Sequence, residues 1–237
     1  MRHPKIYQTL LDKKKAHQKS LAVLVDPDKA TSAYFHNLSH FAANHTIDYF
    51  FVGGSIVHTT HHDTVIHLKN KYQIPIILFP GHYSHLDTDA DAILFLSLIS
   101  GRNPEYLIGQ QVIAAPMIKR SGLEVISTGY MLIDSGVPTT VSYMSHALPI
   151  PYDKPQIAAS TALAGEYLGM KTIFLDAGSG GLKTVSEVMV SAVSEEVSTP
   201  MIVGGGVKTW AKVQSLYQAG ADIVVIGSAI EQSGILQ

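Results

Sequence analysis

The sequence contains no cysteine among its 237 residues. Disulfide bonds and thiolate chemistry are therefore excluded, and a cytoplasmic location is the simplest expectation. Residues 1–19 are polar and carry no apolar stretch, so no signal peptide is expected there. Long hydrophobic runs are lacking too: the apolar stretches are interrupted within about ten residues, too few to cross a bilayer. Any membrane contact is expected to be peripheral at most.

The sequence also lacks a large excess of either charge: it has 17 lysines and arginines and 19 aspartates and glutamates, for a formal net charge of −2. A nucleic-acid-binding surface would need basic residues clustered on one face, and we expect no such partner. The short run Lys13-Lys14-Lys15 is interpreted as the solvated face of an N-terminal helix. The length, and the absence of any linker or shift in composition, predict a single domain over residues 1–237.

Eight short apolar runs are present along the chain, and most of them are rich in β-branched residues without polar alternation. This composition is typical of strands that are covered on both faces, as in parallel sheets. The eight runs are residues 21–25, 49–52, 75–79, 92–95, 124–131, 172–175, 201–203 and 223–226.

Helical patterns separate most of these runs, at residues 32–43, 59–72, 104–118, 154–168, 183–197 and 209–219. Alternation of strands and helices indicates a parallel sheet. Eight strands favour a closed α/β structure, a single (β/α)8 TIM barrel, over an open doubly wound sheet. Residues 81–91 are too few for a full helix, so the third helix is expected to be replaced or shortened. Residues 133–154 form a long loop with three prolines, which is typical of a functional lid.

Polar and glycine residues follow the first two strands, at the end of the barrel where ligands bind in this fold. Asp26-Pro27-Asp28-Lys29 follows the first strand, and its two carboxylates are expected to face the mouth and to suit Mg²⁺. The alternative is a simple turn with a helix cap. Gly53-Gly54-Ser55 ends the second strand and offers a hydroxyl to a metal or a phosphate, the alternative being a tight turn capped by Ser55.

Glycine-rich turns also follow the sixth, seventh and eighth strands. Asp176 begins a Gly/Ser loop that could bind a hydroxyl and a phosphate together, and Gly204-Gly205-Gly206 and Gly227-Ser228 end the last two strands. Turns at these two places, with a short final helix, are the usual phosphate site of this fold. The pair therefore predicts phosphate binding, with plain turns as the alternative.

Several histidines are candidate metal ligands. His58 and His62 are four residues apart and are expected on one helical face. A zinc site needs three or four ligands, which the sequence does not supply, so surface or core histidines are the preferred interpretation. His82 and His85 follow the third strand near the mouth, where substrate contact is the alternative to a structural role. No strand contains a lysine at its core, which argues against a Schiff-base aldolase.

Seven short motifs occur in an order that resembles the geranylgeranylglyceryl phosphate synthase / PcrB family of prenyltransferases. The resemblance extends over about residues 21–230. The motifs are Asp26-Pro-Asp-Lys29, Gly53-Gly-Ser55, Phe79-Pro-Gly81, Thr128-Gly-Tyr130, Phe174-Leu-Asp-Ala-Gly-Ser-Gly180, Gly204-Gly-Gly206 and Gly227-Ser228. The PcrB branch of the family carries a lysine where this chain has Leu24, so the chain is more similar to the archaeal-type branch.

The resemblance implies a Mg²⁺-dependent transferase of lipid biosynthesis. Such an enzyme joins a polyprenyl diphosphate, geranylgeranyl in archaeal-type members, to the 3-hydroxyl of sn-glycerol 1-phosphate and releases pyrophosphate. Asp26 and Ser55 would hold Mg²⁺, Asp176 would act as base, and Tyr130 would line the site. The resemblance also implies a homo-oligomer. The implied substrate-binding residues are Phe174, Leu175, Asp176, Ala177, Gly178, Ser179, Gly180, Gly205, Gly206, Gly227 and Ser228.

The chain departs from the family where many members have Tyr-Leu-Glu and this chain has Phe174-Leu175-Asp176. The shorter carboxylate would need a closer substrate or a bridging water. The prenyl tail needs an apolar groove, and the candidate residues, which could equally be ordinary barrel core, are Phe79, Phe95, Leu96, Leu98 and Ile99.

Two other functions are compatible with the glycine-rich turns alone. One is another phosphate-binding barrel enzyme, such as a sugar-phosphate isomerase or a flavin-linked oxidase, and the other is a non-catalytic isoprenoid- or phosphate-binding protein. The Asp-Pro-Asp-Lys and Gly-Gly-Ser motifs favour the prenyltransferase. The sequence leaves open the accepted prenyl chain length and the number of subunits.

Overall fold

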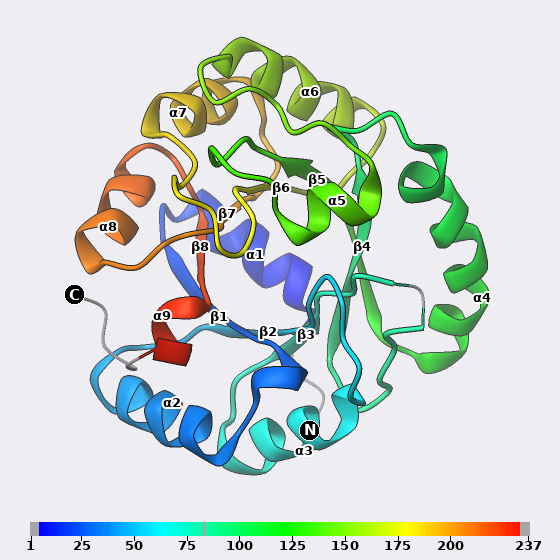
Figure 1. Cartoon of the computed structure of the whole chain (residues 1–237), viewed down its shortest axis with the longest axis vertical. Helices are drawn as coiled ribbons and strands as arrows, with labels where there is room; N and C mark the ends of the chain where they lie inside the picture. Colours follow the sequence, from blue (N-terminus) through cyan, green and yellow to red (C-terminus); the bar gives the residue numbers. More distant parts are fainter. Residues whose placement is uncertain (1–4, 83, 233–237) are drawn as a thin grey trace.

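The computed structural model describes residues 5–82 and 84–232 and contains a closed barrel of eight parallel strands (Figure 1). Each strand pairs with the next along the chain, and β8 pairs with β1 to close the ring. The eight predicted strands and the TIM-barrel fold are confirmed. The strands are β1 (Ser20–Val25), β2 (Tyr49–Val52), β3 (Ile76–Leu78), β4 (Ala92–Leu98), β5 (Glu124–Leu132), β6 (Thr172–Asp176), β7 (Met201–Gly204) and β8 (Ile223–Ile226).

Helices cover the outside of the barrel. They are α2 (Ser32–Asn44), α3 (His61–Lys71), α4 (Gln110–Ser121), α6 (Pro155–Tyr167), α7 (Glu187–Glu196) and α8 (Trp210–Gln218), and short α9 (Ser228–Gln232) follows β8. A 3₁₀ turn, η1 (Pro27–Lys29), follows β1, and a π-helical turn, η2 (Glu105–Gly109), precedes α4. Helix α7 begins later than predicted, because the Ser186 hydroxyl accepts a hydrogen bond from Met189 N and caps the helix there.

The third helix of the regular pattern is absent from the described residues between β3 and β4, namely 79–82 and 84–91. This confirms the expectation drawn from the short spacing. The chain there is an irregular loop that lies beside α3. Lys69 on α3 donates a hydrogen bond to the carbonyl of Asp89 in this loop, at 2.6 Å.

Strand residues alternate between two apolar layers, as the period of two in a β-strand requires. Ala22, Phe51 and Ile126 point into the barrel and belong to its inner core. Val23 and Val52 point outward and pack under the helices with Leu38 of α2. A sheet that is buried on both faces in this way explains the near-continuous apolar runs of the sequence.

The N-terminal helix α1 (Ile6–Lys15) closes the end of the barrel opposite the mouth, and Figure 1 shows it crossing behind the ring of strands. Ile6 and Leu10 pack into the inner core. The expectation that the basic run is a solvated helix face is wrong for Lys13 and Lys14. Both are half-buried and form ion pairs, Lys13 with Asp48 and Lys14 with Asp222 at the starts of strands.

The long loop after β5 contains a short helix that was not predicted, α5 (Thr140–Ser145). Thr139 caps it through reciprocal hydrogen bonds with Ser142. Figure 1 shows α5 lying over the mouth of the barrel, where a lid would be expected. In the described part of the chain, every helix is too short or too polar to traverse a bilayer.

Candidate active site

A cavity at the carboxyl ends of the strands brings most of the predicted site residues together. Its walls come from the ends of β1, β2, β5, β6, β7 and β8, although these segments are far apart in the sequence. The predicted residues that line it are Asp26, Ser55, Tyr130, Asp176, Gly178, Ser179, Gly205, Gly206, Gly227 and Ser228.

Four predicted substrate-binding residues do not line this cavity. Leu175 and Ala177 are fully buried in the outer core under the helices. Gly180 is exposed beyond the cavity rim. The Phe174 ring is buried beneath the site, where its centroid is 5.3 Å from that of Phe79 and 5.5 Å from that of Tyr130. Phe174 therefore supports the site from below with an aromatic contact.

One side of the cavity is an acidic corner formed by the ends of β1 and β2. The Asp26 carboxylate accepts a hydrogen bond from Asp28 N at 3.1 Å and lies 3.6 Å from Lys29 Nζ. Gly54 packs against this carboxylate: a methyl group at Gly54 would be 3.5 Å from Asp26 Cγ. Ser55 is the next residue after Gly54 and lines the same cavity as Asp26. A carboxylate and a hydroxyl are hard oxygen donors, which fits a Mg²⁺ that keeps several waters.

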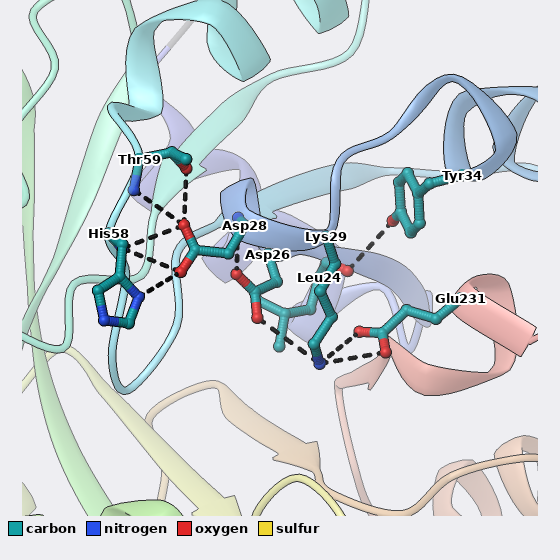
Figure 2. A network of polar contacts seen from close by, with 8 residues as sticks. All are labelled: Leu24, Asp26, Asp28, Lys29, Tyr34, His58, Thr59 and Glu231. Carbon is teal, nitrogen blue, oxygen red and sulfur yellow. Dashed lines mark hydrogen bonds and ion pairs between the residues drawn. The ribbon is translucent and has the colours of Figure 1, made fainter.

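The second carboxylate of the motif, Asp28, has a structural task and does not line the cavity, contrary to expectation. It accepts hydrogen bonds from the backbone amides of His58 and Thr59 at 2.9–3.0 Å, and from the Thr59 hydroxyl at 2.7 Å (Figure 2). These bonds hold the pKa of Asp28 well below its usual range. Asp28 thus fastens the loop after β2, which carries Ser55, to the loop after β1, where Gly54 packs against Asp26.

His58 and His62 do not share a helical face as predicted. His58 precedes α3 and its Nδ1 is 3.0 Å from Asp28 Oδ2, whereas His62 lies in the first turn of the helix and near Asp87. The helix begins at His61, later than the periodicity suggested, because residues 58–60 are held in an extended connection by Asp28.

An ion pair links the acidic corner to α9. No local pattern in the sequence predicts it. Lys29 Nζ is 3.1 Å from both carboxylate oxygens of Glu231 (Figure 2). Burial alone would lower the pKa of Lys29, but Glu231 and Asp26 outweigh it and raise that pKa above its ordinary value. Lys29 and Glu231 both line the cavity, so a cationic group lies beside the acidic corner.

A buried carboxylate and phenol face each other at the centre of the site. Tyr130 Oη donates to Asp176 Oδ2 at 2.6 Å, and Gly178 N donates to Asp176 Oδ1 at 2.7 Å. Burial raises the pKa of Asp176, while the hydrogen bonds from Tyr130 and Gly178 oppose that shift. Burial and the Asp176 charge raise the pKa of Tyr130 well above its ordinary value, so the phenol remains a neutral donor. The two hydrogen bonds therefore hold the Asp176 carboxylate in one orientation.

The turn after β7 packs tightly against this carboxylate. Gly205 adopts a φ of +88°, and a methyl group there would be 2.6 Å from the amides of Ala177 and Gly178 and 2.7 Å from Asp176 Oδ1. Only a residue without a side chain fits such a close approach and such a backbone. The turn after β7 thus packs directly against Asp176 and the backbone that follows it.

Gly205→Ala is expected to lower the free energy of unfolding by about 2–4 kcal/mol, since it adds a collision with backbone to an unfavourable φ. Gly180→Ala is the matched control: its φ is +80°, but nothing lies within 4 Å of the added methyl group. It should cost only about 1–2 kcal/mol, the penalty for the left-handed backbone alone. Urea denaturation measures both, and equal losses would contradict the close packing inferred at Gly205.

A second, apolar cavity opens from the first. The two share Gly54, Ser55, Ile56, Phe79, Tyr130 and Val141. Beyond these residues its wall is formed by Leu96, Leu98, Tyr106, Gln110, Gln111 and Met144, together with His82 and His85. The polar cavity is thus continuous with an apolar groove. Val141 and Met144 were missed because α5 was not predicted.

Two of the five groove candidates lie elsewhere. Ile99 packs against Gly129 and Gly165, away from the groove. Phe95 lines a smaller neighbouring cavity together with Ala114 and Ile118. Phe79, Leu96 and Leu98 do line the apolar groove.

Comparison with known proteins gives consistent matches. The chain matches the PcrB family over residues 14–236. The geranylgeranylglyceryl phosphate synthase of Chitinophaga pinensis is 53% identical over 231 residues, covering 97% of this chain and 92% of that protein. The protein of the same name from Pyrococcus furiosus is 40% identical, covering 96% and 89%. The crystal structure of (S)-3-O-geranylgeranylglyceryl phosphate synthase from Thermoplasma acidophilum, in complex with its substrate sn-glycerol-1-phosphate, matches with a TM-score of 0.90 and 33% identity, covering 98% and 93%.

Proposed function

Because this chain belongs to the PcrB family, we propose that it is a geranylgeranylglyceryl phosphate synthase-type prenyltransferase. It joins a polyprenyl diphosphate to the 3-hydroxyl of sn-glycerol 1-phosphate, giving an ether-linked prenylglyceryl phosphate and pyrophosphate. The observation that carries this proposal is the continuity of the polar cavity with the apolar groove, with Ser55, Phe79 and Tyr130 at the junction. A sugar-phosphate isomerase would have no use for such a groove.

Glycerol 1-phosphate is proposed to occupy the polar cavity. Its phosphate would lie against the turns Gly205-Gly206 and Gly227-Ser228, where free backbone amides can donate hydrogen bonds to an anion. Ser179 and Gly178 line the same cavity next to Asp176. Anchoring the phosphate there would place the rest of this short molecule within reach of the Asp176 carboxylate, which lowers the entropic cost of the reaction.

Asp176 is proposed to take the proton from the 3-hydroxyl as that oxygen attacks the first carbon of the prenyl chain. Its raised pKa makes it a stronger base than an exposed aspartate. Tyr130, through its hydrogen bond to Oδ2, is proposed to hold the carboxylate in the orientation that meets the hydroxyl. This arrangement gives the shorter Asp176 a fixed position where many relatives have glutamate.

Asp26 and Ser55 are proposed to hold Mg²⁺ at the acidic corner. When bound, the ion would neutralise charge on the leaving diphosphate. The chain itself contributes a cation next to this corner, since Lys29 lies 3.6 Å from Asp26 and lines the cavity. Lys29 would add to the attraction for the diphosphate.

The prenyl tail is proposed to lie in the groove between Phe79, Leu96 and Leu98, under Val141 and Met144 of α5. Its burial there would supply binding energy in proportion to the apolar area covered. A homo-oligomer is proposed as well, and it is supported by three apolar residues on η2 and α4 that remain exposed, Ile108, Val112 and Ile113. The cytoplasmic location and a membrane contact that is at most peripheral stay predictions.

An assay of pyrophosphate release tests the proposed function. Release is expected only when Mg²⁺, sn-glycerol 1-phosphate and a prenyl diphosphate are all present, and a series of prenyl diphosphates of increasing length would define the accepted chain. Release at the same rate without glycerol 1-phosphate would indicate a diphosphatase instead. Binding of either substrate without any release would favour a non-catalytic binding protein.

A further inference from the structure

A second cluster of metal-binding side chains lies outside the proposed active site, where the first turn of α3 meets the loop between β3 and β4. His62 belongs to the helix, and Asp87 and Asp89 belong to the loop. One ligand atom from each of the three lies within 4.8 Å of the other two. None of the three lines the polar cavity or the apolar groove.

The distances within this cluster match those between ligands of a single ion. His62 Nδ1 is 3.3 Å from Asp87 Oδ2 and 3.5 Å from Asp89 Oδ2. Both separations exceed the usual length of an N–H···O hydrogen bond. Two ligands held at about 2.0–2.2 Å from a tetrahedral ion are separated by about 3.3–3.6 Å. The His62 nitrogen is therefore spaced from each carboxylate as one ligand of an ion is from another, and the two carboxylates lie within 4.8 Å of each other.

The charge balance of the cluster is incomplete. The Asp87 side chain is only 5% exposed. Across residues 5–82 and 84–232, no lysine or arginine nitrogen comes within 4.0 Å of either carboxylate, and only His62 does. A buried carboxylate without a counter-charge is costly. Its other oxygen, Oδ1, accepts a hydrogen bond from Asp89 N at 2.8 Å, which fixes its orientation as outer-shell bonds do for metal ligands.

A buried histidine beside the cluster supplies an independent observation. His61 is only 6% exposed, and its Nε2 has no hydrogen-bond partner among the described residues. His61 lines the same surface cavity as His62, Asp87 and Asp89. Buried polar atoms in proteins are nearly always hydrogen-bonded, so an unpaired imidazole nitrogen at this place requires a reason. The His61 ring centroid is 5.0 Å from that of His85, whose Nδ1 is also unpaired in the described part of the chain, so two imidazoles with unpaired nitrogens lie beside the cluster, in the same surface cavity.

We propose that His62, Asp87 and Asp89 bind one divalent transition-metal ion, with water completing its coordination. Mixed imidazole and carboxylate donors suit Zn²⁺ better than Mg²⁺ or Ca²⁺, which prefer oxygen ligands alone. The ion would fasten the loop that replaces the third barrel helix to the start of α3. The role of this ion is structural, and its site is separate from the acidic corner at Asp26, where Mg²⁺ is proposed to bind.

The test is a titration of chelator-treated protein with ZnCl2 by isothermal calorimetry, together with the melting temperature in each state. Wild-type protein is expected to bind one Zn²⁺ per chain and to melt at a higher temperature when it is bound. His62→Ala and Asp89→Asn each change a side chain about half exposed, and should lower the affinity at least about tenfold.

Two controls separate this site from other histidines and from the active site. His36→Ala removes an exposed histidine of α2 and should bind Zn²⁺ as the wild type does. Asp26→Ala should also bind Zn²⁺ normally, although its turnover is expected to be lost. The proposal is overturned if the wild type binds no Zn²⁺, if His62→Ala and Asp89→Asn keep wild-type affinity, or if only Asp26→Ala loses binding.

Discussion

Replacing Asp26 with alanine is expected to lower kcat by about 10³-fold or more, which corresponds to a barrier higher by about 4 kcal/mol. Asp26 is the only carboxylate of the Asp-Pro-Asp-Lys motif that lines the cavity, since Asp28 is turned toward His58 and Thr59. The variant therefore lacks the one motif carboxylate that could hold the proposed Mg²⁺, which would neutralise charge on the leaving diphosphate. Pyrophosphate release at saturating substrates measures the effect.

Asp153→Ala is the matched control for this prediction. Asp153 is largely exposed and lies 3.8 Å from its neighbour Lys154. The same change in charge and size there should leave kcat within about twofold of the wild type, as expected for a surface substitution. The assignment of Mg²⁺ to the acidic corner would be wrong if Asp26→Ala kept more than a tenth of the wild-type kcat and needed little more Mg²⁺ than the wild type for half-maximal activity.

Replacing Asp176 with asparagine is expected to lower kcat by about 10²–10⁴-fold, the usual contribution of a positioned base. Asparagine keeps the size of the side chain: its amide oxygen can accept from Gly178 N, and its NH2 group can donate to the Tyr130 hydroxyl, so the fold should be retained. What is lost is the capacity to take a proton. Because the phosphate anchor at Gly205 and Gly206 is unchanged, KM for glycerol 1-phosphate should change by less than about threefold.

The pH profile of Tyr130→Phe provides a second measure of the same centre. Asp176 acts only when ionised, so activity falls as the pH drops through its pKa. Burial raises that pKa and the Tyr130 hydrogen bond lowers it. Removing the hydroxyl should therefore raise the pKa of Asp176 and move the acidic limb of kcat/KM to higher pH.

Tyr143→Phe, at an exposed tyrosine of α5, is the control and should leave the acidic limb in place. An acidic limb unchanged in Tyr130→Phe, or shifted to lower pH, would argue against Asp176 as the base. A large loss of kcat in Tyr130→Phe with an unaltered limb would instead assign the essential contact to the phenol itself.

The sequence predicted well which residues lie at the mouth of the barrel, because its signals there are local. A strand end followed by Asp26, or by Gly205 and Gly206, must lie at the mouth once the eight strands are parallel. The tasks of individual side chains within a motif were less predictable. Asp26 and Asp28 are two residues apart, yet one lines the cavity and the other secures the loop that carries Ser55.

The failures have a common physical cause. The tasks of Lys13, Lys14 and His58 depend on partners distant in the sequence, such as Asp48, which a local pattern does not contain. The short helix α5 was missed because its six residues, between prolines, are too few for a periodic signal. Ile99 follows β4, and its side chain packs against Gly129 and Gly165 instead of lining the groove, a direction that the local sequence does not show.

By itself the sequence determined the barrel, the order of its strands, and the glycine-rich turns at their ends, since strand periodicity and turn chemistry are set by neighbouring residues. Only the tertiary structure decided which side chains meet. Tyr130 and Asp176 are 46 residues apart, and Lys29 and Glu231 are 202 apart. Such contacts depend on the register of strands and on the direction of each side chain, and both are fixed only when the barrel closes.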